Sequence, residues 1–332
     1  MSTNRKNPPP IVSLRDFLAG PIPEPPQVLH GVLRAGQVAM LAASSKVGKS
    51  WWLKTACISV AAGRSWLGMK TTPGDTLYIN GELEEYDLQV RPQKLIDALG
   101  LGEAPEGMDI WHLRGEHMTI RELVPEILRR QEERGKPYAL IVPDPLYYFN
   151  GGRDENDNSA QAQTMGELAE LAERTGAAVL VAHHFSKGNK SQTDHLDRAS
   201  GAGMFARAVD VFITMTRHAE EDCYTVETTC RSFARPEPFV VRWEYPLWRV
   251  DDSLDPYDLK PIGHAPRPPR FTVENILLLL PKQGLTYTDW KVAAEKTHGM
   301  KETTFAGLLR KARANGSTEK DVFGKYTRTA EA

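Results

Sequence analysis

Short apolar runs alternate with longer amphipathic stretches through the first half of the chain. The runs are typical of buried strands and lie at residues 37–41, 75–80, 138–142 and 177–182, with a weaker one at 109–113. The stretches between them carry apolar residues at helical spacing, which predicts helices at residues 49–62, 84–99, 120–134 and 160–174. Strands that alternate with helices in this way predict an α/β fold, in which a mainly parallel central sheet has helices on both faces.

The pattern changes after Gly201, where short runs rich in β-branched residues occupy 209–216, 223–230 and 239–243. No long helical stretch separates these runs, so we expect strands that extend the sheet, some of them antiparallel. Residues 255–270 contain five prolines in sixteen positions, which is typical of a linker. Residues 1–30 are also proline-rich, and we expect loose order there apart from a short helix at 13–18.

The last part of the chain, residues 271–330, has a pattern of its own. Apolar spacing predicts three short helices, at 273–280, 286–296 and 301–315, with Thr286 or Thr288 as the N-cap of the second. Residues 317–328 resemble a β-hairpin. Three short helices followed by a hairpin predict a small winged helix-turn-helix domain, connected by the linker to the α/β domain.

Composition limits the class of protein. Apolar residues make up 41% of the chain and charged residues 25%, as in ordinary globular proteins. Three cysteines without a C-x-x-C pair favour free thiols over a disulfide framework. The first residues lack the apolar core of a signal peptide and no run is long enough to span a membrane, so we expect a cytoplasmic protein without a membrane partner.

The distribution of charge is more informative than the net charge of −2. Residues 267–332 contain 12 lysines and arginines and 7 acidic residues, a net +5, whereas the remainder of the chain carries −7. A basic C-terminal segment on an acidic body indicates a part that meets a polyanion.

A phosphate-binding loop is the strongest motif. The stretch from Ala42 to Ser50 reads Ala-Ala-Ser-Ser-Lys-Val-Gly-Lys-Ser and lies between a predicted strand and a predicted helix, which is the context that a P-loop requires. We expect Lys49 to reach the β- and γ-phosphates of ATP and the Ser50 hydroxyl to hold Mg²⁺. Ala43 stands where the pattern has its first glycine. The candidate nucleotide-binding residues are Ser44, Ser45, Lys46, Val47, Gly48, Lys49, Ser50 and Trp51. The alternative is a chance Gly-Lys-Ser in a surface turn.

Two carboxylates follow predicted strands at the edge of the sheet that the P-loop shares. Asp144 ends the run Leu-Ile-Val-Pro-Asp and is a second candidate magnesium ligand, and the alternative is a turn-forming Asp-Pro. Glu82 follows the strand at 75–80 and could orient or deprotonate the attacking water. Glu84 and Glu85 lie beside it, so the alternative is an acidic helix start.

Further candidates follow the fourth strand. His184, in the pair His183-His184, could hydrogen-bond the γ-phosphate, or one histidine could be a core residue. Lys187, Lys190 and Arg198 belong to a polar stretch that could grip the backbone of a single strand of nucleic acid, or form an ordinary disordered loop. The candidates for an arginine finger, a cation that stabilises the phosphoryl-transfer transition state, are Arg207, Arg231 and Arg235.

Together these motifs resemble the RecA-like ATPases of the hexameric replicative-helicase type, and in particular the plasmid RepA-type helicases and related phage ATPases. The resemblance covers residues 13–250 and depends on residues 46–50, 80–82, 142–146, 183–188 and 199–201. It implies that residues 31–254 form a RecA-like ATPase domain that binds ATP and Mg²⁺ and assembles as a homo-oligomer, expected to be a hexamer. It also implies that Glu82 is the catalytic base, that Asp144 is the Walker B residue and that His184 senses the γ-phosphate. At the family's arginine-finger position this chain has Asp210, with Arg207 one turn earlier.

The winged helix-turn-helix lies outside that resemblance. If it binds duplex DNA, the start of its third helix would enter the major groove and the hairpin would contact the backbone. The residues involved would be Lys301, Thr303, Thr304, Arg310, Lys311, Lys320, Lys325 and Arg328. The same fold also serves protein contacts.

The function expected from the sequence is therefore that of an ATP-hydrolysing, DNA-dependent helicase of plasmid or phage replication. The alternative is a nucleotide-switched DNA-binding regulator or loader that does not unwind DNA. A small-molecule kinase fits poorly, because it explains neither Glu82 nor the C-terminal domain.

Overall fold

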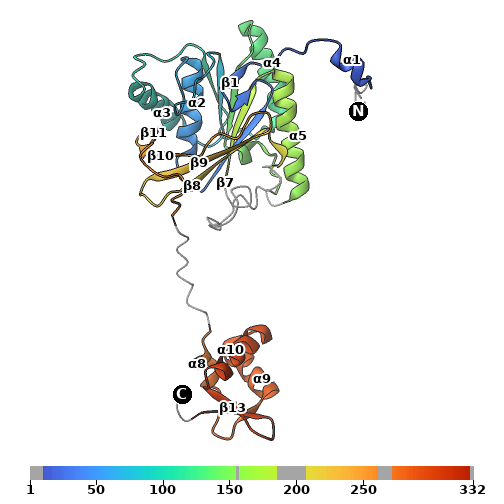
Figure 1. Ribbon diagram of the computed structural model, residues 1–332, viewed down its shortest axis with the longest axis vertical. Coiled ribbons are helices and arrows are strands. Elements are labelled where there is room, and N and C mark those ends of the chain that lie inside the picture. The colour runs from blue at the N-terminus through green and yellow to red at the C-terminus, as the bar shows by residue number, and fades with distance from the viewer. Residues whose placement is uncertain (1–9, 155–156, 185–206, 261–270, 330–332) are drawn as a thin grey trace. The chain divides into compact units, whose positions relative to one another are not determined.

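The computed structural model describes residues 10–154, 157–184, 207–260 and 271–329. The chain divides into two compact units, residues 1–262 and 263–332, and each is described by itself (Figure 1). None of the helices in the described residues is both long enough and apolar enough to cross a membrane.

A nine-stranded mixed sheet forms the centre of the first unit, in the order β11-β10-β9-β8-β3-β7-β6-β4-β5. Its six parallel strands are β3 (Val38–Ala43), β4 (Thr76–Asn80), β5 (Met108–His112), β6 (Leu140–Asp144), β7 (Ala178–His184) and β8 (Val211–Arg217). Three antiparallel strands complete it at the β8 side, namely β9 (Cys223–Cys230), β10 (Phe239–Glu244) and β11 (Leu247–Val250). The expected sheet, mostly parallel and extended by antiparallel strands, is confirmed.

Helices cover both faces of this sheet, with α2 (Lys49–Ala61) and α3 (Glu85–Ala98) on one side and α4 (Ile120–Arg134) and α5 (Asn158–Thr175) on the other (Figure 1). Side chains alternate along the strands, so β3 contributes Leu41 to the core beneath α2 and Met40 to the core beneath α4 and α5. A short 3₁₀ helix, η1 (Leu146–Phe149), follows β6 directly. These elements agree with an α/β P-loop NTPase fold.

The segment expected to be loosely ordered ends earlier than residue 30. It contains α1 (Leu14–Leu18), which has no buried residue, and then β1 (Gln27–Leu29) pairs with β2 (Leu33–Arg34). Val28 and Leu29 are buried in the same core as α2. The strand is only three residues long, so its pattern could not be separated from the prolines before it.

The expected linker begins later than residue 255. Residues 255–260 lie on the first unit, where Asp258 O accepts the Ala219 N–H and the Lys260 N–H is donated to Arg217 O. His218 also contacts the carbonyl oxygen of Asp255. Prolines do not prevent these bonds because the carbonyl groups and the non-proline amides remain available for pairing.

The second unit contains three helices and a three-stranded antiparallel sheet in the order β12-β14-β13. The elements are α8 (Val273–Leu277), β12 (Leu285–Thr286), α9 (Tyr287–His298), α10 (Glu302–Ala314), β13 (Thr318–Lys320) and β14 (Lys325–Arg328). Its core gathers around the fully buried Trp290 and Phe305. Thr286 is the N-cap of α9, and α8 is three residues shorter than expected because Pro281 disfavours helical backbone just before it.

Candidate functional site

The P-loop connects the end of β3 to the start of α2. Lys46 and Gly48 both adopt left-handed backbone, with φ of 63° and 82°. No side chain caps α2 at Gly48, so the first amides of the helix face the loop. Left-handed residues next to a helix N-terminus direct backbone N–H groups to one place, which is the geometry that binds phosphate.

Ala43 does not disturb this arrangement. It is the last residue of β3, fully buried and paired with His184 on one side and Met215 on the other. Extended backbone does not need glycine, so the missing glycine of the motif has no structural cost here.

Lys49 lies at the base of the loop with 7% of its surface exposed. Its Nζ donates hydrogen bonds to Ser44 O at 2.8 Å and to Ala43 O at 3.3 Å. Burial lowers the pKa of Lys49 to about 8, and the negative charges of Asp144 and Glu82 oppose the shift. The ammonium is therefore directed at the loop and has two carboxylates nearby.

A pocket of about 500 Å³ opens over the loop. It brings together most residues predicted for the site, namely Ser45, Lys46, Gly48, Lys49, Ser50, Trp51, Glu82 and Asp144. Two predicted residues take other places. Val47 is buried in the core beneath the loop, and Ser44 contributes its carbonyl oxygen to Lys49.

Asp144 ends β6 and is 4% exposed. Its Oδ2 accepts a hydrogen bond from the hydroxyl of Tyr78, and the Lys54 Nζ donates to that same hydroxyl. Burial lowers the pKa of Lys54 to about 8, with the charge of Asp144 opposing. Burial and the charge of Asp144 raise the pKa of Tyr78 well above its ordinary value. Asp144 is thus a carboxylate at the pocket wall whose orientation is fixed by the Tyr78 hydroxyl. A simple Asp-Pro turn would not require this hydrogen bond.

Glu82 is exposed and lines the pocket, two residues beyond the end of β4. Asn80 pairs with Asp144 across the sheet, so the two carboxylates lie at the ends of neighbouring strands. Glu84 has a different place, because its carboxylate accepts the backbone N–H groups of Tyr86 and Asp87 and caps α3. Among these acids, the helix-start alternative describes Glu84 and does not describe Glu82.

The donor set fits a nucleotide with a divalent cation. The loop amides and Lys49 suit phosphate, while the hydroxyl of Ser50 and the carboxylate of Asp144 are the hard oxygen ligands that Mg²⁺ takes together with phosphate oxygens. Within the described residues, no group of three or more His, Cys, Asp or Glu forms a metal site by itself.

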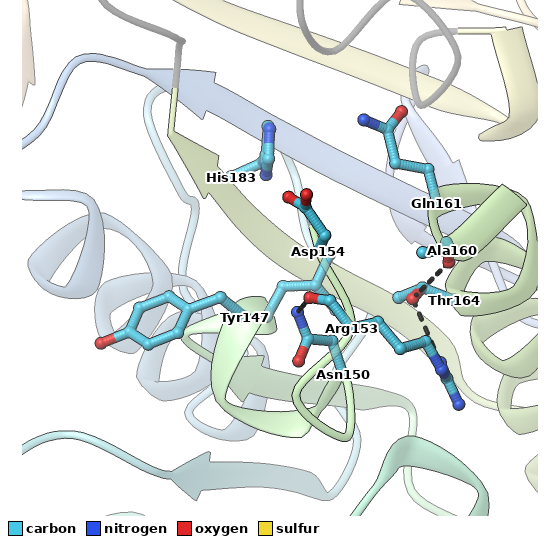
Figure 2. Close-up of a pocket in the computed structure, with 9 residues that line it drawn as sticks. Tyr147, Asn150, Arg153, Asp154, Ala160, Gln161, Thr164 and His183 are labelled. Carbon is cyan, nitrogen blue, oxygen red and sulfur yellow. Dashed lines mark hydrogen bonds between the residues drawn. The ribbon is translucent and has the colours of Figure 1, made fainter. Parts of the chain in front are cut away.

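His183 and His184 differ in what the structure describes. His184 pairs with Ala43, so its backbone lies beside the start of the P-loop, but its side chain lies outside the described residues. His183 is 8% exposed and lines a second, much smaller pocket that Tyr147 shares with the first (Figure 2). Figure 2 shows Asn150, Arg153 and Asp154 on the segment after η1 and Gln161 and Thr164 on α5 around this second pocket.

The arginine-finger candidates lie away from the pocket. β8 runs parallel to β3 with Val211 opposite Ala39, and Asp210 accepts the N–H of Val38, so Arg207 is at the amino edge of the sheet. The P-loop is at the carboxyl edge, about 20 Å along the six residues of β3. Arg207 is therefore placed where it cannot serve the pocket of its own chain.

Arg231 and Arg235 are engaged within the chain. Arg231 forms an ion pair with Asp210 at 3.3 Å and donates to Arg207 O at 2.8 Å. Arg235 lies 3.6 Å from a carboxylate oxygen of Glu227. Asp210, which stands at the expected finger position, instead connects Val38 of β3 to Arg231, the residue that follows β9.

Sequence reasoning missed four side chains around the pocket. Arg91, on α3, lines it, pairs with Asp87 at 3.0 Å and lies 5.3 Å above the Trp51 ring. The Trp248 ring lies against Gly48 from β11, Tyr78 donates to Asp144, and Lys54 donates to Tyr78. No local pattern marks any of them, because each is one polar or aromatic residue within an ordinary helix or strand.

The residues predicted to bind DNA divide into two groups. In the second unit all the predicted side chains are exposed, namely Lys301, Thr303, Thr304, Arg310, Lys311, Lys320 and Lys325. Arg328 forms an ion pair with Glu274 at 3.4 Å. Lys187, Lys190 and Arg198 lie outside the described residues.

Comparison with known proteins identifies the family of the domain that contains this site. A search of the curated proteins finds no match. The family model described as AAA domain matches residues 3–190, which is more than half of the chain and includes the P-loop, Glu82, Asp144 and β7. The match agrees with the pocket, since an AAA domain implies that nucleotide is bound and hydrolysed, typically with a divalent metal. The chain belongs to the AAA domain family of P-loop ATPases.

Proposed function

We propose that this ATPase is a ring-forming, DNA-dependent motor, a helicase of the plasmid RepA type that acts in plasmid or phage DNA replication. The observation that carries the proposal is the gathering of Lys49, Ser50, Glu82 and Asp144 around one pocket at the carboxyl edge of the sheet. That set supplies a phosphate cradle, a cation site and a carboxylate for water, which is what phosphoryl transfer to water needs.

Each residue has a definite task in this proposal. Lys49 binds the β- and γ-phosphate oxygens and stabilises the charge that develops on them. Glu82 orients the attacking water and takes its proton as the water oxygen bonds to the γ-phosphorus and ADP leaves. Ser50 and Asp144 would hold Mg²⁺, which when bound neutralises phosphate charge.

The position of the arginines supports a ring. Arg207 and Arg231 lie near the amino edge of the sheet, opposite the P-loop of their own chain. An arginine finger drawn from them can reach only the nucleotide of a neighbouring copy, so full turnover would need a homo-oligomer, for which we propose a hexamer. His184 of β7 pairs with Ala43 of β3 and would sense the γ-phosphate and transmit its presence to the loop that follows.

DNA contacts would come from two places. Lys187, Lys190 and Arg198 would grip single-stranded DNA inside the ring. The second unit, with three helices and a small antiparallel sheet, would act as a winged helix-turn-helix at residues 271–330, joined through residues 255–270. The exposed start of α10, at Lys301, Thr303 and Thr304, would enter the major groove, with Arg310, Lys311, Lys320 and Lys325 at the backbone.

Steady-state ATP hydrolysis with and without single-stranded DNA tests the proposal. We expect stimulation by DNA in the native protein and a loss of about 10²–10⁴-fold in Glu82→Gln and about 10²–10³-fold in Lys49→Ala. Glu84→Gln is the matched control, because Glu84 caps α3 outside the pocket. Hydrolysis that survives Glu82→Gln would exclude Glu82 as the base.

A second candidate function is a nucleotide-switched DNA-binding regulator or loader. The pairing of Arg231 with Asp210 and of Arg235 with Glu227 favours it, since a chain whose arginines are engaged would turn over slowly. Such a switch would bind one duplex sequence tightly with a steep dependence on salt and would ignore single strands. Duplex binding by the full chain, measured from 50 to 200 mM salt, separates the two functions.

A further inference from the structure

Lys54 is a charged side chain in an unusual place. It belongs to α2, the helix that begins in the P-loop, and its exposed fraction is 0%. An ammonium group is costly to bury unless a hydrogen-bond or charge partner compensates it. Its Nζ donates to the Tyr78 hydroxyl and lies 3.9 Å from the centre of the Tyr78 ring.

The direction of the hydrogen bonds is fixed by chemistry. The ammonium of Lys54 can only donate, and the carboxylate of Asp144 can only accept. The hydroxyl between them must therefore accept from Lys54 and give its one proton to Asp144 Oδ2. A tyrosine with a free rotor would have several orientations, but here a single one satisfies both partners.

The strand pairing and the helix spacing also fix where these three residues lie. Tyr78 lies on β4 opposite Val142 of β6, and Asp144 is two residues further along β6 on the same face of the sheet. Ser50 and Lys54 are four residues apart in α2 and so lie on one face of that helix. One helix thus carries both the hydroxyl at the pocket and the ammonium that is linked to Asp144 through Tyr78.

We propose that Lys54 and Tyr78 are positioning residues that hold the Asp144 carboxylate in the orientation in which it meets the divalent cation. Because the two oxygens of a carboxylate are rigidly joined, fixing Oδ2 also fixes where Oδ1 points. The inference rests on the proposed function in one respect, namely that Asp144 belongs to the cation shell of a bound nucleotide.

The rival explanation is purely structural. Lys54 could simply compensate the buried charge of Asp144 and stabilise the core. Both explanations expect a less stable protein when the link is broken, so stability cannot separate them. A change in the contribution of Mg²⁺ to nucleotide binding can, since core packing alone would not move it.

The experiment measures binding of a fluorescent ADP analogue to the full chain, once in EDTA and once across a Mg²⁺ titration. Tyr78→Phe removes the linking hydroxyl and keeps the ring. We expect affinity in EDTA to be unchanged and the apparent affinity for Mg²⁺ to fall by about tenfold to a hundredfold. Lys54→Met should show the same loss, and Mn²⁺ binding followed by electron paramagnetic resonance gives a second readout without catalysis.

Tyr138→Phe is the matched control. Tyr138 is also a buried tyrosine, and its hydroxyl donates to Asp109, a carboxylate that does not line the P-loop pocket. It should lose stability without any change in the Mg²⁺ dependence. If Tyr78→Phe binds the nucleotide with native Mg²⁺ dependence and only melts earlier, the link is structural and the inference is overturned. If the native protein itself binds nucleotide without any effect of Mg²⁺, the proposed function and the inference both fail.

Discussion

Gly48 shows how closely the P-loop depends on one backbone conformation. Its φ is 82°, and a Cβ built at this position would lie 3.3 Å from the Trp248 indole. An L-residue would therefore be strained by its left-handed conformation and crowded by the ring as well. Both effects act on the turn that directs the amides at the phosphates.

We expect Gly48→Ala to lower the free energy of unfolding by about 1–2 kcal/mol and to abolish measurable nucleotide binding. Gly135→Ala is the control, since Gly135 has φ of 70° at the end of α4 with no atom within 4 Å of its built Cβ. Chemical denaturation and titration with a fluorescent nucleotide check both. Equal binding by the two variants would show that the loop relaxes around the methyl group.

Residue chemistry at the pocket was partly predictable. Lys49 and Ser50 follow from the motif, and Glu82 and Asp144 follow from the rule that parallel strands end at one edge. The connection through Tyr78 was not predictable, because Leu77-Tyr78-Ile79 is simply an apolar strand and Lys54 an ordinary helical lysine in the sequence. Their contact depends on β4 lying beside β6 over α2, which is a property of the tertiary structure.

At the scale of elements, ion pairs connect the end of α4 to two strands, β4 and β5. Arg134 forms ion pairs with Asp75, just before β4, and with Asp109 of β5. Burial alone would raise the pKa of Asp75, but hydrogen bonds from Lys136 and Arg134 outweigh it and hold the pKa below its ordinary value. The cluster therefore stabilises the edge of the sheet that carries β5.

Arg134→Met should lower the free energy of unfolding by about 2 kcal/mol at neutral pH, because it leaves partly buried carboxylates with fewer charged donors. A depressed carboxyl pKa gives stability that is present above the unfolded value, about 3.9, and is lost as the pH falls through the lower folded value. The variant should thus lose less stability than the native protein between pH 5 and pH 3.

Urea unfolding at pH 7, 5, 4 and 3 measures this difference. Arg129→Met is the control on the same helix, because Arg129 is exposed and pairs only with its helical neighbours Glu126 and Glu133 within the described residues. It should change little at any of these pH values. A native-like acid response in Arg134→Met would assign the pH dependence to Lys136 instead.

Which elements the sequence could predict depends on their surroundings. The central strands are buried on both faces and appear as continuous apolar runs, so β3, β4, β6 and β7 were located within two residues. β1, β11 and β12 have two to four residues each and form by pairing with a neighbouring strand. Runs this short do not establish a period, which is why they were missed.

For the whole molecule, the acidic first unit and the basic second unit also have separate hydrophobic cores. The first unit has its core on both faces of the large sheet, and the second has a separate core around Trp290. Trp290 is fully buried, donates from Nε1 to Ile276 O at 2.8 Å and lies 5.4 Å from the Phe305 ring. A small unit of this kind has little stability to spare.

Trp290→Ala should cost about 3–5 kcal/mol, which is comparable to the whole stability of a domain this small, and so should unfold the second unit. Nucleotide binding by the first unit should stay native, because the residues that line its pocket all belong to that unit. If the proposed motor is correct, stimulation of hydrolysis by single-stranded DNA should remain while binding to duplex DNA is lost. Differential scanning calorimetry should show one of two transitions disappear, and Val292→Ala, an exposed change on the same helix, should keep both. Loss of nucleotide binding together with the second transition would mean that the two units fold as one, and that the C-terminal unit is part of the ATPase and not an attachment to it.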